Sequence, residues 1–217
     1  MNIRILLADD HNILREGLRG LLEKQPDVRV VGEANNGMAT VQLARELSPD
    51  VIIMDITMPG LNGVEATRQI VAANPRVKIV ALSVHCEQDY VVAMLKAGAA
   101  GYLVKDCAFA ELASAVRAVL ANHVYLSPSV ASVIADSDLQ DLPEKELSAF
   151  SVLTARECEV LQLLAEGKTI KETASCLRLS EKTIEKHRQR ITEKLGIFSI
   201  AELTKYAIRH GLTPVRA

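Results

Sequence analysis

Residues 51–60 read Val-Ile-Ile-Met-Asp-Ile-Thr-Met-Pro-Gly, a short apolar strand pattern that ends in Asp55 and runs into a turn. The run at residues 3–8 ends in the same way, before Asp9 and Asp10. If these strands are parallel neighbours, their carboxyl ends meet at one edge of a sheet, where open α/β folds bind ligands. Three carboxylates gathered there would repel one another unless a hard cation such as Mg²⁺ lay between them. The pattern therefore predicts a phosphate-handling or metal site.

Around this stretch, β-branched runs alternate with amphipathic runs that have apolar residues at three- and four-residue spacing. The predicted strands are residues 3–8, 28–33, 51–54, 78–82 and 101–104. The predicted helices are residues 13–24, 38–47, 63–73, 86–97 and 108–121. Five successive βα units indicate an α/β fold with a doubly wound, five-stranded parallel sheet.

Beyond this region the pattern changes. Residues 124–149 are predicted to be a linker, with room for a short helix near residues 128–135, because the periodicity weakens and residues 136–146 are rich in acidic side chains. After it only helical patterns follow, at residues 154–166, 170–177, 181–195 and 200–210. The predicted organisation is therefore an α/β domain (residues 1–123), a linker (residues 124–149) and a small all-α domain (residues 150–217).

Charge is divided unevenly along the 217 residues. Residues 1–150 hold 13 basic and 19 acidic side chains, a net charge of −6. Residues 151–217 hold 12 basic and 8 acidic side chains, a net charge of +4. The asymmetry favours an anionic partner, such as nucleic acid, for the second part. No apolar run approaches the roughly 18 residues of a membrane span and no signal peptide pattern opens the chain, so a cytoplasmic protein is expected.

The four cysteines show no C-x-x-C spacing. They are too far apart in sequence to indicate a zinc site or a disulfide framework, and free cysteine is most often buried. We therefore expect all four to be packing residues: Cys86, Cys107, Cys158 and Cys176.

Two further polar side chains follow predicted strands. Ser83 comes after the fourth strand and Lys105 after the fifth. With these, the chain resembles the receiver domain of two-component response regulators, which has a flavodoxin-like fold. The resemblance covers residues 2–121 and rests on Asp9-Asp10, on residues 54–60, on Ser83 and on Gly-Tyr-Leu-Val-Lys at residues 101–105.

The resemblance implies a role for each of these residues. Asp55 would accept a phosphoryl group from a sensor histidine kinase. Mg²⁺ would be held by Asp10, Asp55 and the carbonyl of Thr57, with Asp9 assisting. Lys105 and Mg²⁺ would neutralise the phosphoryl oxygens, Ser83 would hydrogen-bond them, and Tyr102 would be a switch residue that rotates inward; the alternative for Tyr102 is a half-buried edge aromatic.

An enzyme is the main rival for this site. Haloacid-dehalogenase-like phosphatases also use an aspartate nucleophile at a strand end, but they typically carry a second aspartate two residues later as general acid. Thr57 occupies that position here. We therefore expect no turnover of external phosphoesters, only slow phosphorylation and dephosphorylation of Asp55.

The helical part contains the pattern of a helix-turn-helix. Thr154 and Glu157 have capping-box spacing, and Ser180 is a natural N-cap for the helix at residues 181–195. Ile184, Ile191 and Leu195 share the apolar face of that helix. Lys182, Lys186, Gln189 and Glu193 lie on the opposite face, which is free to read a groove, and Lys182 is one of the expected DNA contacts. We expect Glu185, Lys186 and Gln189 to read bases and Thr183, His187, Arg190 and Lys194 to contact phosphates; the alternative is a merely solvated face.

Residues 151–213 resemble the LuxR-type helix-turn-helix, through Leu153-Thr154-x-Arg156-Glu157 and Ser-Glu-Lys-Thr-Ile-Glu-Lys-His at residues 180–187. Arg188 departs from the family, which often has an apolar residue there; either its aliphatic stem covers the core or the helix is slightly shifted. The apolar stripe of residues 200–210 is interpreted mainly as core, with a dimer contact, as in relatives, as the alternative.

A receiver joined to this helix-turn-helix resembles the NarL/FixJ subgroup of response regulators. The resemblance implies a transcription factor in which phosphorylation of Asp55 controls dimerisation and binding to specific double-stranded DNA, with RNA polymerase as a candidate further partner. Our mechanistic hypothesis is that the acidic receiver masks the basic helix until phosphorylation. The alternative is a phosphorylation-independent transcription factor whose receiver is an interaction module.

Overall fold

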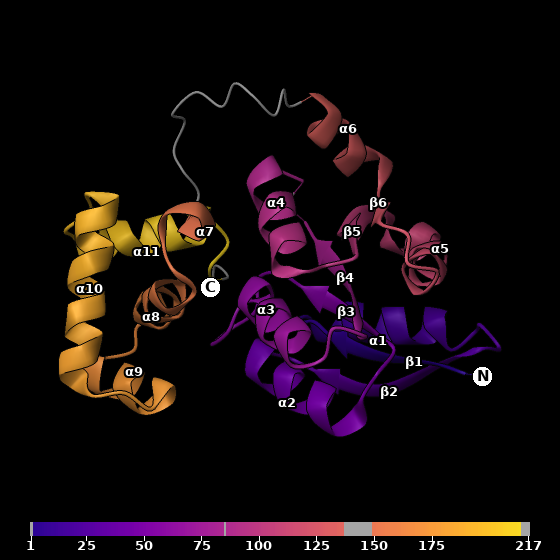
Figure 1. Cartoon of the computed structure of the whole chain (residues 1–217), viewed down its shortest axis with the longest axis horizontal. Coiled ribbons are helices and arrows are strands. Elements are labelled where there is room, and N and C mark those ends of the chain that lie inside the picture. The colour runs from indigo at the N-terminus through magenta and orange to yellow at the C-terminus, as the bar shows by residue number, and fades with distance from the viewer. Residues whose placement is uncertain (1, 85, 137–148, 214–217) are drawn as a thin grey trace.

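The computed structural model describes residues 2–84, 86–136 and 149–213, which form a sheet domain and a helical domain side by side (Figure 1). Within these ranges no helix combines the length and apolar character that crossing a bilayer requires.

The sheet has six parallel strands in the order β2-β1-β3-β4-β5-β6. The strands are β1 (Ile3–Ala8), β2 (Val28–Ala34), β3 (Val51–Asp55), β4 (Lys78–Ser83), β5 (Gly101–Val104) and β6 (Tyr125–Leu126). The predicted α/β class and the five predicted strands are confirmed. The sequence predicted one strand fewer than the sheet contains, because β6 has only two residues, too few for a periodic pattern.

Helices cover both faces of the sheet. They are α1 (Asn12–Leu22), α2 (Gly37–Leu47), α3 (Gly63–Ala73), α4 (Gln88–Ala97), the 3₁₀ turn η1 (Lys105–Cys107), α5 (Ala108–Leu120) and α6 (Pro128–Asp136). Leu6 and Met54 point into the core under α2, α3 and α4, whereas Leu7 and Ile53 point into the core under α1 and α5. The central strands are therefore apolar on both faces, as expected for a parallel sheet between two helical layers.

Part of the predicted linker is structured. β6 pairs with β5, and α6, which confirms the helix expected near residues 128–135, packs on the sheet domain through the fully buried Val130. Residues 137–148 of the predicted linker lie outside the described residues.

The helical domain contains α7 (Ala149–Val152), α8 (Ala155–Ala165), α9 (Ile170–Leu177), α10 (Glu181–Leu195) and α11 (Ile200–Arg209). Their core is centred on residues such as Leu161, Ile184, Ile191 and Leu203. The predicted capping box of Thr154 and Glu157 is present. Ser180 caps α10 by accepting a hydrogen bond from Thr183 N, as its position before the helix predicts.

The cysteine prediction is only partly right. Cys158 is buried in the core of the helical domain, but Cys86 and Cys176 are exposed and free. Cys86 lies between β4 and α4, and Cys176 lies near the end of α9 on a groove that residues of α2 and α8 also line, so neither is buried in a core. The side chain of Cys107 is not described.

Candidate functional sites

The register of the sheet brings the predicted carboxylates together. Ala8 of β1 pairs with Met54 of β3, so the residues that follow, Asp9 and Asp55, lie next to each other at the carboxyl edge. Both are buried, with 2% and 3% of their surface exposed, and Asp10 is partly exposed beside them. The strand-end prediction is therefore confirmed in geometry for all three residues.

Lys105 provides the positive charge of the site. Its Nζ lies 2.9 Å from Asp9 Oδ2 and 2.9 Å from Asp55 Oδ2. Burial raises the pKa of Asp55 to about 7, against the attraction of Lys105 and with the help of repulsion from Asp9 and Asp10. Burial acts to lower the pKa of Lys105, but the attraction of Asp55 and Asp9 outweighs it and raises that pKa. The site thus holds more negative charge than one lysine compensates.

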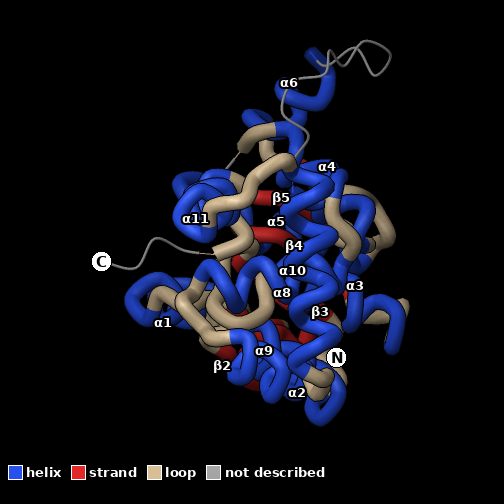
Figure 2. The backbone as a smooth tube through the Cα atoms, turned by 90° about the vertical axis from the view of Figure 1, so that its left-hand side faces the viewer, coloured by secondary structure: helices blue, strands red, loops and turns tan. Residues whose placement is uncertain are grey.

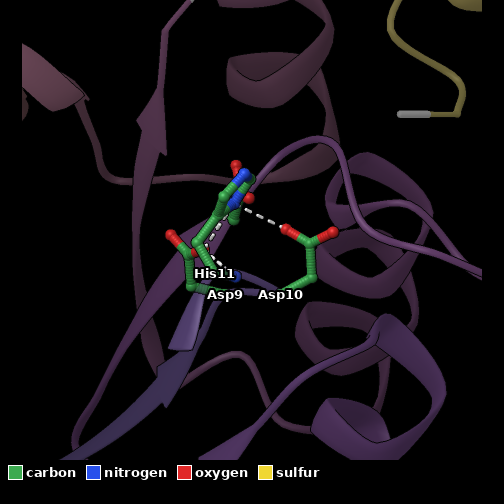
Figure 3. A group of neighbouring side chains, drawn as sticks. Asp9, Asp10 and His11 are labelled. Carbon is green, nitrogen blue, oxygen red and sulfur yellow. Dashed lines mark hydrogen bonds and ion pairs between the residues drawn. The ribbon is translucent and has the colours of Figure 1, made fainter. Parts of the chain in front are cut away.

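His11 was not predicted as part of this group. Its Nδ1 lies 2.8 Å from Asp10 Oδ1 and 3.2 Å from Asp9 Oδ1 (Figure 3). The ligand atoms of Asp9, Asp10, His11 and Asp55 all lie within 4.8 Å of one another. The direct succession of His11 after two site aspartates was the available signal in the sequence; His11 is also the residue that precedes α1.

The residues fit a hard divalent cation. Among the described residues, Asp9 Oδ2, Asp10 Oδ1 and Asp55 Oδ2 have no partner beyond their ion pairs with Lys105 and His11, although all three atoms are buried. Carboxylate oxygens of this kind are the ligands that Mg²⁺ prefers. Thr57, two residues after Asp55, lies in the segment that leads from β3 to α3.

Ser83 and Tyr102 lie on the neighbouring strands β4 and β5. Ser83 is buried at the end of β4, one residue beyond the Leu82 that pairs with Asp55. Tyr102 is fully buried, and burial raises its pKa, while a hydrogen bond with Ser83 opposes that rise. The interpretation of Tyr102 as a half-buried edge aromatic is therefore wrong: its ring is already turned inward and is in contact with Ser83.

The burial of Asp55 leads to a prediction for stability. Because its pKa rises from 3.8 in the unfolded chain to about 7, ionisation of Asp55 disfavours the folded state. Without Mg²⁺, we expect Asp55→Asn to raise the free energy of unfolding by roughly 1–4 kcal/mol above pH 7. The gain should shrink between pH 7 and pH 4 and vanish below pH 4, where Asp55 is protonated in both states. Urea unfolding across this pH range measures it, and a gain that is independent of pH would contradict the explanation.

The second predicted surface lies on α10, and Figures 1 and 2 place this helix on the side of the helical domain that faces away from the sheet domain. Ile184 and Ile191 are buried. The predicted contact residues that are exposed are Lys182, Glu185, Lys186, Gln189, Arg190 and Lys194. The hypothesis that the receiver masks this helix is therefore wrong for this structure, because α8 and α11, not α10, lie next to the receiver.

Two of the predicted phosphate contacts, Thr183 and Lys194, have internal partners, and a third, His187, is half-buried. Thr183 Oγ1 lies 2.7 Å from Ser180 Oγ at the start of α10. Lys194 Nζ donates a hydrogen bond of 2.6 Å to Glu157 Oε2 on α8. His187 is half-buried; burial lowers its pKa, and its Nδ1 has no hydrogen-bond partner among the described residues. Lys194 in particular connects α10 to α8.

The structure also decides between the alternatives predicted for Arg188 and for the apolar stripe of α11. Arg188 is exposed and lines a groove with Phe198 and Ile200, rather than covering the core. Leu203 and Ala207 are buried, which confirms the interpretation of this part of the stripe as core. Ile200, by contrast, is 53% exposed, because it lies at the first turn of α11 beside the groove.

Replacing Lys194 tests whether this side chain stabilises the helical domain through Glu157 or contacts DNA phosphate. Glu157 is almost fully buried, so Lys194→Ala leaves its carboxylate without its ionic partner. We expect the helical domain to lose about 1–2 kcal/mol of stability. The salt dependence of DNA binding should change less than in Lys186→Ala. Urea unfolding and binding at several salt concentrations test this; unchanged stability with a reduced salt slope would show that Lys194 contacts phosphate instead.

Known protein families match both parts of the chain. Residues 5–117 match the response regulator receiver domain, and residues 151–207 match the bacterial regulatory proteins of the luxR family. The chain is 39% identical over 216 residues to the response regulator GacA of Pseudomonas viridiflava, covering 99% of this chain and 100% of GacA. It is 41% identical over 210 residues to the response regulator UvrY of Escherichia coli K12, covering 97% of this chain and 95% of UvrY.

Two solved structures match the chain, one over nearly its whole length and one over about three fifths of it. The response regulator RcsB in a complex with DNA is 29% identical with a TM-score of 0.60, over 95% of this chain and 98% of that one. A LuxR-family response regulator from Aurantimonas is 40% identical with a TM-score of 0.60, over 62% of this chain and 96% of that one. The matched families and relatives define a DNA-binding response regulator of a two-component system, not an enzyme. More narrowly, the chain belongs to the NarL/FixJ family, in which a receiver is joined to a LuxR-type helix-turn-helix.

Proposed function

We propose that a sensor histidine kinase phosphorylates Asp55 and that this phosphorylation controls dimerisation and the binding of α10 to specific DNA. The observation that carries the proposal is the site itself. A buried carboxylate lies 2.9 Å from a lysine ammonium, beside two further carboxylates, at the carboxyl edge of a parallel sheet. Partners of this kind would place the protein in the cytoplasm, and RNA polymerase remains a predicted further partner.

The residues support a direct transfer to Asp55. The bond between an Asp55 oxygen and phosphorus forms as the bond between phosphorus and the kinase imidazole breaks, and the imidazole then takes up a proton from water. Bound Mg²⁺ supplies positive charge for the phosphoryl oxygens. Asp10, Asp55 and the Thr57 carbonyl would hold this ion, with Asp9 assisting.

Lys105 and Ser83 act on the product. Lys105 Nζ, which bridges Asp9 and Asp55, can shift to a phosphoryl oxygen without leaving the site. Ser83 can donate a hydrogen bond to another of these oxygens. Because Ser83 also contacts Tyr102, its shift changes the environment of a fully buried side chain on β5. The phosphorylated state would be transmitted through this pair of residues.

The exposed face of α10 supports DNA binding by the helical domain. Lys182, Lys186 and Arg190 present positive charge there, and Gln189, whose Nε2 now donates to Glu193 Oε1 at 2.8 Å, can exchange that bond for a base edge. Two such helices in successive major grooves lie roughly 34 Å apart, which requires a dimer. Solved structures described as an RcsB–DNA complex and as RcsB dimers bound to DNA support the same arrangement here.

The test is to select DNA from a random pool with the full chain, with and without Mg²⁺ plus beryllofluoride as a mimic of the phosphorylated state. Enrichment of a two-fold symmetric motif only with the mimic supports the proposal. Equal enrichment in both arms would favour the phosphorylation-independent regulator, to which the uncovered α10 already lends support. No enrichment in either arm would contradict DNA binding through α10.

A further inference from the structure

The loop that carries Asp9 and Asp10 is held in place by β2, although none of the site residues named above lies on that strand. The amide N of Asp9 donates to the Ala34 carbonyl at 3.1 Å, so the backbone of β2 fixes one end of Asp9. The other end is held by a side chain, because Arg15 of α1 donates through Nη1 to the Asp9 carbonyl at 2.8 Å. The two hydrogen bonds leave the backbone of Asp9 little freedom to rotate.

The guanidinium of Arg15 is in turn fixed by its other donors. Its Nε lies 2.8 Å from Glu33 Oε2 on β2, and its Nη2 donates at 2.9 Å to Asn12 Oδ1 in the first turn of α1. The side chain of Arg15 is only 15% exposed. One planar group therefore joins three segments, which are β2, the start of α1 and the peptide that follows Asp9. A guanidinium has the fork of donors that this requires, whereas an ammonium does not.

Glu33 gives this arrangement a rigid base. It pairs in register with Leu7 of β1, two residues before Asp9, so it belongs to the sheet and not to a loop. Burial acts to raise the pKa of Glu33, but hydrogen bonds from Arg15 and Arg19 outweigh it and lower that pKa. Glu33 is therefore ionised at neutral pH, and its pair with Arg15 is a charge-assisted hydrogen bond of the strong kind.

The direction of the Asp9 carbonyl decides where two carboxylates lie. This carbonyl belongs to the planar peptide that joins Asp9 to Asp10, so fixing it also fixes the Cα of Asp10. The Asp9 carboxylate is oriented separately, because Oδ1 accepts from His11 N at 2.8 Å and Oδ2 lies 2.9 Å from Lys105 Nζ. The loop drawn in Figure 3 thus depends on Arg15 for the direction of its first peptide.

Repulsion within the site explains why the loop needs such an anchor. Ligand atoms of Asp9, Asp10 and Asp55 lie within 4.8 Å of one another, and Lys105 compensates only part of their charge. Like charges at this distance push the loop away from β3 when no cation lies between them. If the loop could yield, only a fraction of the molecules would hold the oxygens close enough for a cation, and the affinity would fall by that fraction.

We propose that Arg15 is a positioning residue for the metal site: held by Glu33, it keeps the loop of Asp9 and Asp10 in the geometry that binds Mg²⁺. The inference rests on the proposed function, because it concerns the same site. Among the described residues, Arg15 forms an ion pair with Glu33 and with no carboxylate of the site. The positive charge of Arg15 opposes the binding of a cation, so a loss of Mg²⁺ affinity on its removal has to come from lost geometry.

The experiment compares full-length wild type with Arg15→Ala and Arg15→Lys. Calorimetry measures the affinity for Mg²⁺ at constant ionic strength, without a phosphoryl donor. We expect Arg15→Ala to bind Mg²⁺ about 10-fold more weakly than wild type, the lower end of the loss typical when a group that orients a metal ligand is removed. Arg15→Lys keeps the charge but cannot serve Glu33, Asn12 and the Asp9 carbonyl with one fork, so it should recover only part of the affinity.

Arg19→Ala is the matched control. Arg19 lies on the same helix and donates to the other oxygen of Glu33, Oε1, at 2.6 Å, but it is 48% exposed and its second partner is Glu23. Its removal takes away an equal charge and leaves the bonds of Arg15 in place. Mg²⁺ affinity should therefore stay unchanged or rise slightly, whereas in Arg15→Ala it falls.

A double-mutant cycle tests whether Glu33 acts through Arg15. Glu33→Ala should weaken Mg²⁺ binding in the wild-type background, because it releases the guanidinium from β2. In the Arg15→Ala background the same change should have little further effect, since the group through which Glu33 acts is already absent. Urea unfolding checks that each variant is folded at the assay temperature, and if Arg15→Ala is not, Arg15→Lys and Glu33→Ala carry the same comparison.

Phosphorylation by acetyl phosphate, followed by intact mass, gives a separate readout. At limiting Mg²⁺, Arg15→Ala should react more slowly than wild type, in proportion to its weaker affinity for the cation. At saturating Mg²⁺ its rate should return close to the wild-type rate, because the contacts of Arg15 do not include Asp55. A rate that stays low at saturating Mg²⁺ would contradict a role limited to the metal site.

The outcomes separate this inference from the proposed function. If wild type binds Mg²⁺ and Arg15→Ala binds it equally well or more tightly, Arg15 acts only through its charge, and the inference is overturned while the proposed function stands. Equal losses in Arg15→Ala and Arg19→Ala would also overturn it, since the effect would then belong to α1 in general. If wild type itself binds no Mg²⁺, the metal site of the proposed function fails as well.

Discussion

Replacing Asp55 with asparagine is expected to reduce phosphoryl incorporation from acetyl phosphate by at least about 100-fold, the loss typical when a group essential to the reaction is removed. An amide has nearly the same shape as the carboxylate but is a far weaker nucleophile. The amide NH₂ would also face Lys105, whose Nζ lies 2.9 Å from Asp55 Oδ2. Intact mass spectrometry of the full chain, with and without Mg²⁺, measures the change as the fraction that carries one additional phosphoryl group.

A matched control separates the site from a general loss of charge. Asp27→Asn removes a partly exposed carboxylate that pairs with Arg117 on the receiver surface, and it should be phosphorylated like wild type. In the DNA selection, Asp55→Asn should enrich the same sequences with and without acetyl phosphate. If Asp55→Asn is still phosphorylated at the wild-type rate, Asp9 or Asp10 is the acceptor and the assignment of Asp55 is wrong.

Substitutions on α10 are expected to have the second large effect, and to separate base reading from phosphate contact. Gln189→Ala should weaken binding to the selected DNA by about 5- to 150-fold, equivalent to 1–3 kcal/mol, and relax the preference at one base position. Arg190→Ala should weaken binding to all sequences alike and reduce the salt slope by about 1. Both side chains are exposed, so folding should be unaffected.

Lys205→Ala is the control for this series, since it removes an exposed positive charge from α11 instead of α10. It should leave both the base preference and the salt slope close to wild type. Binding is measured by fluorescence anisotropy on the selected duplex and on a scrambled duplex at several salt concentrations. If Gln189→Ala weakens both duplexes equally, Gln189 contacts the backbone and a different residue reads that base.

Local patterns in the sequence were sufficient for most elements and for the receiver site. Strands β1 and β3 are apolar over the residues that lead to their carboxyl ends, residues 5–8 and 51–54, and the aspartates come directly after them. The edge at which Asp9, Asp10 and Asp55 meet therefore follows from parallel pairing alone. Ser180 and Thr154 marked helix starts correctly because N-capping depends on residues only three positions apart.

Short elements and internal ion pairs were harder to predict. β6 and α7 have two and four residues, below the length at which periodicity is informative. Lys194 was assigned to DNA phosphate because it lies on the flank of a basic helix. Its partner, Glu157, lies 37 residues earlier, and nothing in the α10 pattern indicates that the two side chains meet.

The amino-acid order was thus enough to establish the two domains, the parallel sheet, the acidic edge and the polar face of α10, because each depends on periodicity or on residues close together in the chain. Folding in three dimensions was needed to bring Gln162 to Asn62 and Glu166 to Gly60, pairs that are 100 and 106 residues apart. Such contacts have no local signal, since Gln162 and Glu166 read as ordinary polar positions on a helix. Gln162 becomes buried only because a second domain covers that face, and that packing places the helical domain against the loop that follows Asp55 while leaving α10 uncovered.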